Sequence, residues 1–125
     1  MRVLPAIIAL CGLTLFGWPN GVAWGHAFPD HSEPKVGATL TVAPSRVRIW
    51  FDGTLEPAFS GLHVQDTKGQ QVDTGDGHVD PADATLLEVS LRPLAPGSYR
   101  VTWSVVARDG HRTEGDFMFT IQRRD

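Results

Sequence analysis

The sequence predicts an all-β domain, an antiparallel β-sandwich with Greek-key connections. Three observations support this fold class. Apolar and polar residues alternate with a period of two in several short runs, as in strands with one buried face. Turn-forming pairs such as Asp52-Gly53 and Pro96-Gly97 separate these runs. No segment has a convincing helical period of apolar residues, and nine prolines disfavour helices.

The first 25 residues differ from the rest and predict a signal peptide. Arg2 precedes an apolar stretch at positions 3–18, and the small-x-small pattern of positions 23–25 follows it. These are the regions of a secretory signal, so we expect cleavage after Gly25 and export to the periplasm. An uncleaved membrane anchor is the alternative, but about 16 apolar residues fall short of the roughly 20 that span a bilayer.

Cleavage after Gly25 would leave residues 26–125, which is enough chain for one domain. Cys11 is the one cysteine of the sequence and would be removed with the signal. The mature domain would therefore have no disulfide and no thiolate to act as a nucleophile or a metal ligand.

Five segments of the domain carry the strand pattern: 46–52, 62–64, 87–91, 99–107 and 117–121. The turn before the fourth segment resembles a tyrosine corner, in which a Tyr early in a strand bonds back to the preceding turn. The apolar positions that we expect to face the core are Val47, Ile49, Phe51, Leu62, Val64, Leu87, Val89, Leu91, Tyr99, Val101, Trp103, Val105, Ala107, Phe117, Phe119 and Ile121.

The charge balance bears on the partners of the protein. The chain has 11 Lys and Arg against 14 Asp and Glu, a net charge of -3 at pH 7, without a block of like charge. Nucleic-acid binding needs clustered cations, so we expect no nucleic-acid partner. We also expect no small-molecule substrate.

Histidine is the residue type that points to chemistry. After cleavage, His26 would be the N-terminal residue, and its α-amine and imidazole could chelate one metal ion. Nitrogen ligands of this kind suit Cu(II). Such a site needs further ligands from elsewhere in the chain.

Two candidate ligands follow the longest predicted strand. If the alternation of 99–107 continues, Asp109 and His111 lie on one side, and Gly110 between them leaves space for a close approach. An Asp-Gly-His tripeptide is a weak signal because it is common in solvated turns, and residues 76–78 repeat it. The terminal histidine favours the first tripeptide as the metal site.

Several motifs then occur together along residues 26–125. They are HAFP at 26–29, VRIWF at 47–51, PAFS at 57–60, LAPGSYRVTW at 94–103, VVARDGH at 105–111 and GDFMF at 115–119. In this combination and order the domain resembles the CopC family of exported copper-resistance proteins.

The resemblance implies an immunoglobulin-like or cupredoxin-like sandwich or Greek-key barrel. It also implies one Cu(II) site made by the amine and imidazole of His26 with Asp109 and His111. The role implied is copper homeostasis, resistance or delivery, without catalysis, and the partner implied is an inner-membrane copper transporter of the CopD type.

Two departures from the family pattern narrow this interpretation. Some relatives carry a glutamate where this chain has Gly53, so that contact is absent or is supplied by Asp52 or Glu56. Some also carry a methionine-rich loop for Cu(I), whereas Met118 is the one methionine of residues 26–125. We therefore expect no Cu(I) site.

The other histidines have simpler explanations. His63 has the opposite parity to its apolar neighbours, which predicts a solvent-facing strand position. His31 is expected in a surface loop, with an outer ligand as the alternative. His78 is expected in a solvated acidic loop, with a weak second metal site as the alternative.

Two other function classes compete with a copper-binding protein. One is a copper oxygenase with an N-terminal histidine brace, which would need an open coordination position and a flat aromatic surface. The other is a metal-free immunoglobulin-like interaction module, because this architecture hosts many functions.

Overall fold

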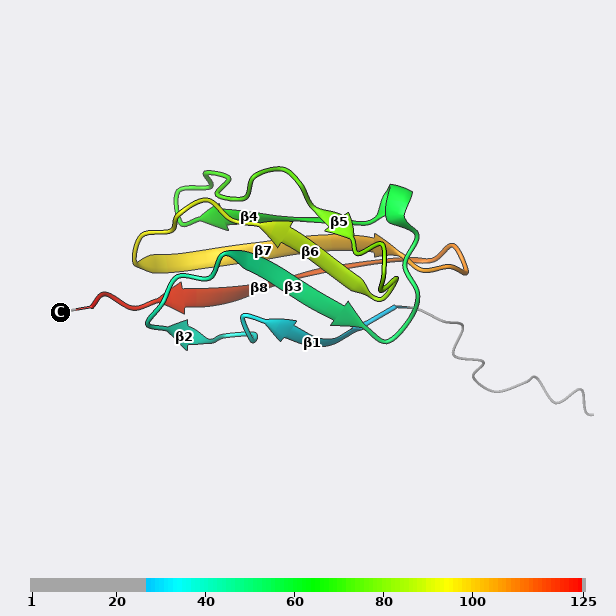
Figure 1. The fold of residues 1–125 in the computed structure, drawn as a ribbon, viewed down its shortest axis with the longest axis horizontal. Helices are drawn as coiled ribbons and strands as arrows, with labels where there is room; N and C mark the ends of the chain where they lie inside the picture. The colour runs from blue at the N-terminus through cyan, green and yellow to red at the C-terminus, as the bar shows by residue number, and fades with distance from the viewer. Residues whose placement is uncertain (1–26, 125) are drawn as a thin grey trace, which may run out of the picture.

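A computed structural model of the chain describes residues 27–124; the predicted signal peptide and His26 lie outside these residues. Eight strands in the described part form two facing four-stranded sheets, of order β1-β3-β6-β5 and β2-β8-β7-β4 (Figure 1). The strands are β1 Pro29–Glu33, β2 Thr39–Leu40, β3 Arg46–Phe51, β4 Gly61–Asp66, β5 His78–Val79, β6 Leu86–Ser90, β7 Gly97–Val106 and β8 Arg112–Ile121, with a short 3-10 helix at Pro57–Phe59.

The predicted sandwich is confirmed, and all five predicted strand segments are strands, as β3, β4, β6, β7 and β8. The sequence did not indicate β1, β2 or β5. Two of these have only two residues, and β1 has one buried position, so none shows a readable alternation. The sheets are antiparallel except that β2 pairs with β8 in parallel, which corrects the wholly antiparallel expectation.

The core lies between the two sheets and is made by the residues that the alternation predicted. Fifteen of the sixteen predicted core positions are buried, and Leu91 is partly buried against them. Phe51 of one sheet meets Trp103 of the other edge to face, with ring centroids 5.2 Å apart. Since burial of one large apolar side chain contributes about 1.5–3 kcal/mol, this layer supplies most of the driving force for folding.

The predicted tyrosine corner is present at the start of β7. The hydroxyl of Tyr99 donates a hydrogen bond to the carbonyl oxygen of Ala95. Burial, and then the nearby carboxylate of Asp66, raise the pKa of Tyr99, which keeps the phenol protonated and able to donate.

A buried carboxylate that the sequence analysis missed closes the outer edge of β4. Asp73 is fully buried, and its Oδ2 accepts the backbone N–H of Val64 at 2.8 Å. Its Oδ1 accepts bonds from Gln71 Nε2 at 2.8 Å and from the Gly75 N–H at 2.9 Å. Burial raises the pKa of Asp73, but these hydrogen bonds and the nearby His63 outweigh it and lower the pKa below its ordinary value. The carboxylate thus takes the place of a strand carbonyl as the acceptor for the Val64 N–H, beside the backbone bond from the Val72 N–H to the Val64 carbonyl.

Two features of the fold place the candidate site. The hairpin between β7 and β8 and the start of the described chain lie at the same end of the sandwich (Figure 1).

No helix in the described part of the chain is long and apolar enough to cross a membrane.

Candidate metal centre

The hairpin between β7 and β8 carries the first Asp-Gly-His tripeptide. The turn is closed by a bond from the Ala107 N–H to the His111 carbonyl at 2.9 Å and by one from the Gly110 N–H to the Ala107 carbonyl at 2.8 Å. Gly110 has a φ of 89°, in the left-handed region that glycine adopts without steric cost. The turn is therefore defined by backbone geometry that favours glycine at this position.

The side chains of Asp109 and His111 converge in this turn. Asp109 Oδ1 accepts the backbone N–H of His111 at 3.0 Å, and its Oδ2 lies 3.1 Å from His111 Nδ1. The side chain of His111 is 56% exposed and that of Asp109 is 22% exposed. A carboxylate and an imidazole thus meet at a point that solvent reaches.

The two side chains are close, as expected, but the predicted reason was wrong. The prediction continued the strand alternation through His111, whereas β7 ends at Val106 and the chain turns. The carboxylate-to-backbone bond of the turn brings the pair together. A Cβ at Gly110 would meet nothing within 4 Å among the described residues, and the positive φ is the feature of the turn that favours glycine there.

The first described residues are held beside this hairpin. Thr113 Oγ1 on β8 donates to the Ala27 carbonyl at 2.7 Å, and Ala27 is fully buried. Asp52 Oδ1, just after β3, accepts the Phe28 N–H at 2.8 Å, while the Asp52 N–H donates to the Phe28 carbonyl at 2.9 Å. Asp52, a candidate for an additional ligand, therefore contacts the backbone of the N-terminal segment. The predicted ligand His26 precedes Ala27 and lies outside the described residues.

The second Asp-Gly-His tripeptide has a different geometry. Asp76 Oδ1 accepts the backbone N–H of Ser90 at 2.8 Å, and bonds from Ser90 lower the pKa of Asp76 to about 2. His78 Nδ1 lies 2.7 Å from the backbone carbonyl of Asp76, and its Nε2 lies 3.3 Å from Glu88 Oε1. The carboxylate and the imidazole of this tripeptide therefore have separate partners.

The surroundings of His78 also disfavour a metal cation. Glu88 Oε2 lies 3.3 Å from Arg48 Nε and 3.8 Å from Arg46 Nη1, so two guanidinium charges surround the carboxylate. His78 belongs to β5, which corrects its expected loop position.

The two remaining histidines lie on strands. His63 is 64% exposed on β4, as predicted, and its Nδ1 lies 3.5 Å from Asp73 Oδ2. His31 lies on β1 rather than in the expected loop, and its ring stacks on Trp50 with centroids 4.5 Å apart. The register that pairs His31 with Trp50 across β1 and β3 explains this stacking.

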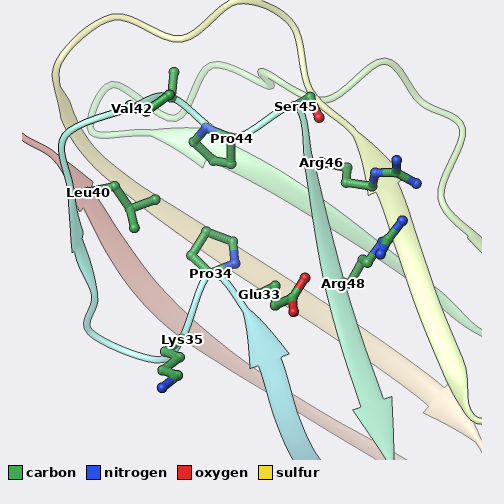
Figure 2. Close-up of a pocket in the computed structure, with 10 residues that line it drawn as sticks. Glu33, Pro34, Lys35, Leu40, Val42, Pro44, Ser45, Arg46 and Arg48 are labelled. Carbon is green, nitrogen blue, oxygen red and sulfur yellow. The ribbon is translucent and has the colours of Figure 1, made fainter.

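A hollow at the other end of β1 and β3 is a poor alternative site (Figure 2). Its charged lining residues are Glu33, Lys35, Arg46 and Arg48, and no histidine lines it. Three cationic side chains against one carboxylate disfavour a metal cation.

Within residues 27–124, no group of three or more His, Cys, Asp or Glu side chains could hold a metal ion. Asp109 and His111 supply two donors, so a metal ion bound there needs donors from outside this pair. Two ligands with bonds of about 2.0 Å to one ion lie about 2.8 Å apart at a right angle and about 3.3 Å apart at a tetrahedral angle. The 3.1 Å between Asp109 Oδ2 and His111 Nδ1 falls between these values.

Comparisons with known proteins identify relatives of this sandwich. The profile of the CopC domain family matches residues 30–122. Protein YobA of Escherichia coli strain K12 is 34% identical over 100 residues, which cover 79% of this chain and 81% of YobA. Copper transport protein CutJ of Bacillus subtilis strain 168 is 30% identical over 104 residues, which cover 82% of this chain and 19% of CutJ. The crystal structure of CopC from Methylosinus trichosporium OB3b matches with a TM-score of 0.71 and 29% identity, over 80% of this chain and 97% of that one.

Proposed function

Because the chain belongs to the CopC family, we propose that it is an exported copper-binding protein that holds one Cu(II) ion through His26, Asp109 and His111. The family relation gives the chain a copper-related function. The ligand set, the oxidation state and the periplasmic location are parts of our proposal. The protein binds copper for homeostasis, resistance or delivery and does not act on it as an enzyme.

The observation that carries this proposal is the meeting of Asp109, His111 and the N-terminal segment at one end of the sandwich. Asp109 Oδ2 and His111 Nδ1 are 3.1 Å apart. Thr113, which is two residues after His111, donates a hydrogen bond to the Ala27 carbonyl. Ala27 is the residue after His26, and consecutive Cα atoms lie about 3.8 Å apart. We therefore expect the amine and the imidazole of residue 26 to reach the pair.

The proposed donor set favours Cu(II). Two nitrogens from His26, one from His111 and an oxygen from Asp109 can form the tetragonal arrangement that Cu(II) prefers. The anionic oxygen also favours Cu(II) over the softer Cu(I). Cu(I) favours sites with several thioether sulfurs. Met118 is the one methionine in the described part of the chain; it is 38% exposed, and its sulfur lies 4.0 Å from Arg100 Nη2.

A copper site with four protein donors distinguishes a binding protein from an oxygenase. An oxygenase needs an open coordination position, and Asp109 in the plane would fill it. We therefore expect no ascorbate-driven peroxide formation from the copper-loaded protein. Peroxide turnover would favour the oxygenase, and failure to bind copper would favour the metal-free interaction module.

The test uses the exported protein from a bacterial host that expresses the full 125-residue chain. Mass spectrometry identifies its first residue, and one equivalent of Cu(II) is added. We expect His26 as the first residue and a nitrogen-rich tetragonal spin-resonance spectrum. A spectrum identical to that of copper in buffer would refute the proposal.

We also propose a membrane copper transporter of the CopD type as the partner. In CutJ, a protein named for copper transport, the similar segment is only 19% of the chain. If the rest of CutJ carries out the transport, this chain needs a separate transporter. Co-expression with such a transporter should raise cellular copper uptake, and an effect that survives removal of Asp109 and His111 would contradict the partnership.

A further inference from the structure

We propose that Asp52 and Thr113 form a clasp that positions the N-terminal segment for copper binding. The clasp is the pair of hydrogen bonds from the Phe28 N–H to Asp52 Oδ1, at 2.8 Å, and from Thr113 Oγ1 to the Ala27 carbonyl, at 2.7 Å. This inference rests on the function proposed above. Both residues are positioning residues, because they contact the backbone that leads to the metal site.

The clasp acts on a single peptide unit. The carbonyl of Ala27 and the N–H of Phe28 belong to the same planar peptide group, in which the two point in opposite directions. Thr113 belongs to the sheet of β8, and Asp52 follows β3 of the facing sheet. The peptide plane is therefore held from both sheets, which fixes the position of the Ala27 Cα from which the chain extends toward residue 26.

Burial of Ala27 strengthens this arrangement. Ala27 is 0% exposed and belongs to the hydrophobic core, so its side chain anchors the same segment from the inside. The carbonyl oxygen next to it is a polar group at the edge of the core and needs a hydrogen-bond partner. The hydroxyl of Thr113 supplies this partner from a half-buried position.

The clasp should raise copper affinity through preorganisation. The residues before β1 would lose conformational entropy on binding copper if they were not already ordered. Ordering them before the metal arrives reduces this loss and strengthens binding without adding a ligand. The orienting role of Asp52 depends on its acceptor oxygen rather than on its charge.

The experiment compares paired substitutions in the exported protein. Asp52→Ala and Thr113→Val remove the two hydrogen-bonding groups, whereas Asp52→Asn keeps an acceptor oxygen and Thr113→Ser keeps a hydroxyl. Two readouts are measured: Cu(II) affinity by chelator competition, and hydrogen exchange of the Phe28 amide in the copper-free protein.

Matched controls lie at the other end of the molecule. Asp66 Oδ1 accepts the backbone N–H groups of Lys68 and Gln70, both at 2.9 Å, and Thr120 Oγ1 lies 3.1 Å from Ser98 Oγ. Asp66→Ala and Thr120→Val therefore remove comparable bonds far from the hairpin. They should change neither copper affinity nor exchange at Phe28.

We expect Asp52→Ala and Thr113→Val each to weaken Cu(II) binding about fivefold, the size of one lost hydrogen bond. Asp52→Asn and Thr113→Ser should stay close to the unsubstituted protein, and Asp52→Ala should speed Phe28 exchange about tenfold.

Three results would overturn the clasp while the proposed function stands: faster Phe28 exchange with unchanged copper affinity, equal weakening by Asp52→Asn and Asp52→Ala, or equal weakening by the two controls. Failure of the unsubstituted protein to bind Cu(II) would instead overturn the proposed function, and the inference with it.

Discussion

At the scale of single residues, two identical tripeptides differ in what their carboxylates bind. Asp109 contacts the imidazole and the backbone of His111, whereas Asp76 accepts hydrogen bonds from Ser90. The tripeptide alone does not decide between these outcomes. The position of the tripeptide decides, because residues 109–111 connect two long strands, whereas Asp76 lies beside Ser90 at the end of β6.

We expect His111→Ala and Asp109→Asn each to weaken Cu(II) binding by about tenfold or more. The first substitution removes a nitrogen donor, and the second removes the charge that offsets the dication. His78→Ala and His63→Ala serve as controls and should have little effect in a competition titration with a chelator. An equal loss from His78→Ala would show that the wrong tripeptide has been chosen.

Asp73 is a residue whose effect should be on stability alone. Asp73→Asn places an amide where three donors point, so we expect a loss of about 2 kcal/mol in the free energy of unfolding. Copper affinity should stay the same. Urea unfolding monitored by fluorescence measures the loss, and an unchanged midpoint would contradict the structural role of the carboxylate.

The same carboxylate predicts a pH dependence. The pKa of Asp73 is lowered in the folded protein, so protonation favours the unfolded chain. Its contribution to stability is present above its ordinary pKa of 3.8 and is lost as the pH falls through the lower pKa of the folded state. The stability difference between the unsubstituted protein and Asp73→Asn should therefore shrink in acid and be constant near neutral pH.

At the scale of the structural element, the β7–β8 hairpin is the unit that makes the site. Its two strands pair over ten positions, so the turn is held rigidly at the end of a long ladder. Rigid elements position donor atoms more accurately than mobile loops do. The donor pair at the turn therefore depends on the turn geometry as well as on the identity of the two side chains.

Gly110→Ala tests this dependence. The substitution puts a Cβ at a φ of 89°, and we expect it to cost about 1 kcal/mol of stability and to weaken Cu(II) binding about threefold by distorting the turn. Gly69→Ala is the matched control, because Gly69 lies in another turn but also has a positive φ, of 77°, and a Cβ added there would meet nothing within 4 Å. Thermal melts and copper titrations of both variants give the comparison. Equal copper affinities would show that the turn geometry does not govern the site.

At the scale of the whole molecule, the proposed site depends on processing. While residues 1–25 remain attached, the nitrogen of His26 is an amide, which is a poor ligand unless it is deprotonated. The sandwich itself does not need a free amine, because the core residues lie between Ala27 and Ile121. Folding and copper binding should therefore respond differently to changes at the N-terminus.

We expect a Met-Gly extension before His26 to weaken Cu(II) binding at least tenfold, about 1.4 kcal/mol, and to leave the unfolding transition unchanged. Competition titration and thermal melts of the extended and unextended forms measure the two quantities. Equal affinities would remove the amine from the ligand set and would undermine the proposed copper site.

The sequence by itself determined the sandwich, its five longer strands and the residues that face the core. Period-two alternation reports directly which side chains leave water, and the hydrophobic effect acts on that pattern wherever the strands pair. The same reading could not show β2 or β5, which are too short to have a period, or the role of Asp73, whose donors come from residues up to nine positions away.

Only the tertiary structure decided how the candidate site is put together. Asp109 and His111 were proposed from the sequence, but their contact depends on a turn whose geometry the alternation did not reveal. The hydrogen bond from Thr113 to Ala27 joins residues 86 positions apart in the sequence. The hydrogen bond from Phe28 to Asp52 joins residues 24 positions apart. Such contacts exist only after two sheets have packed, because no local pattern specifies which distant backbone group a side chain will meet.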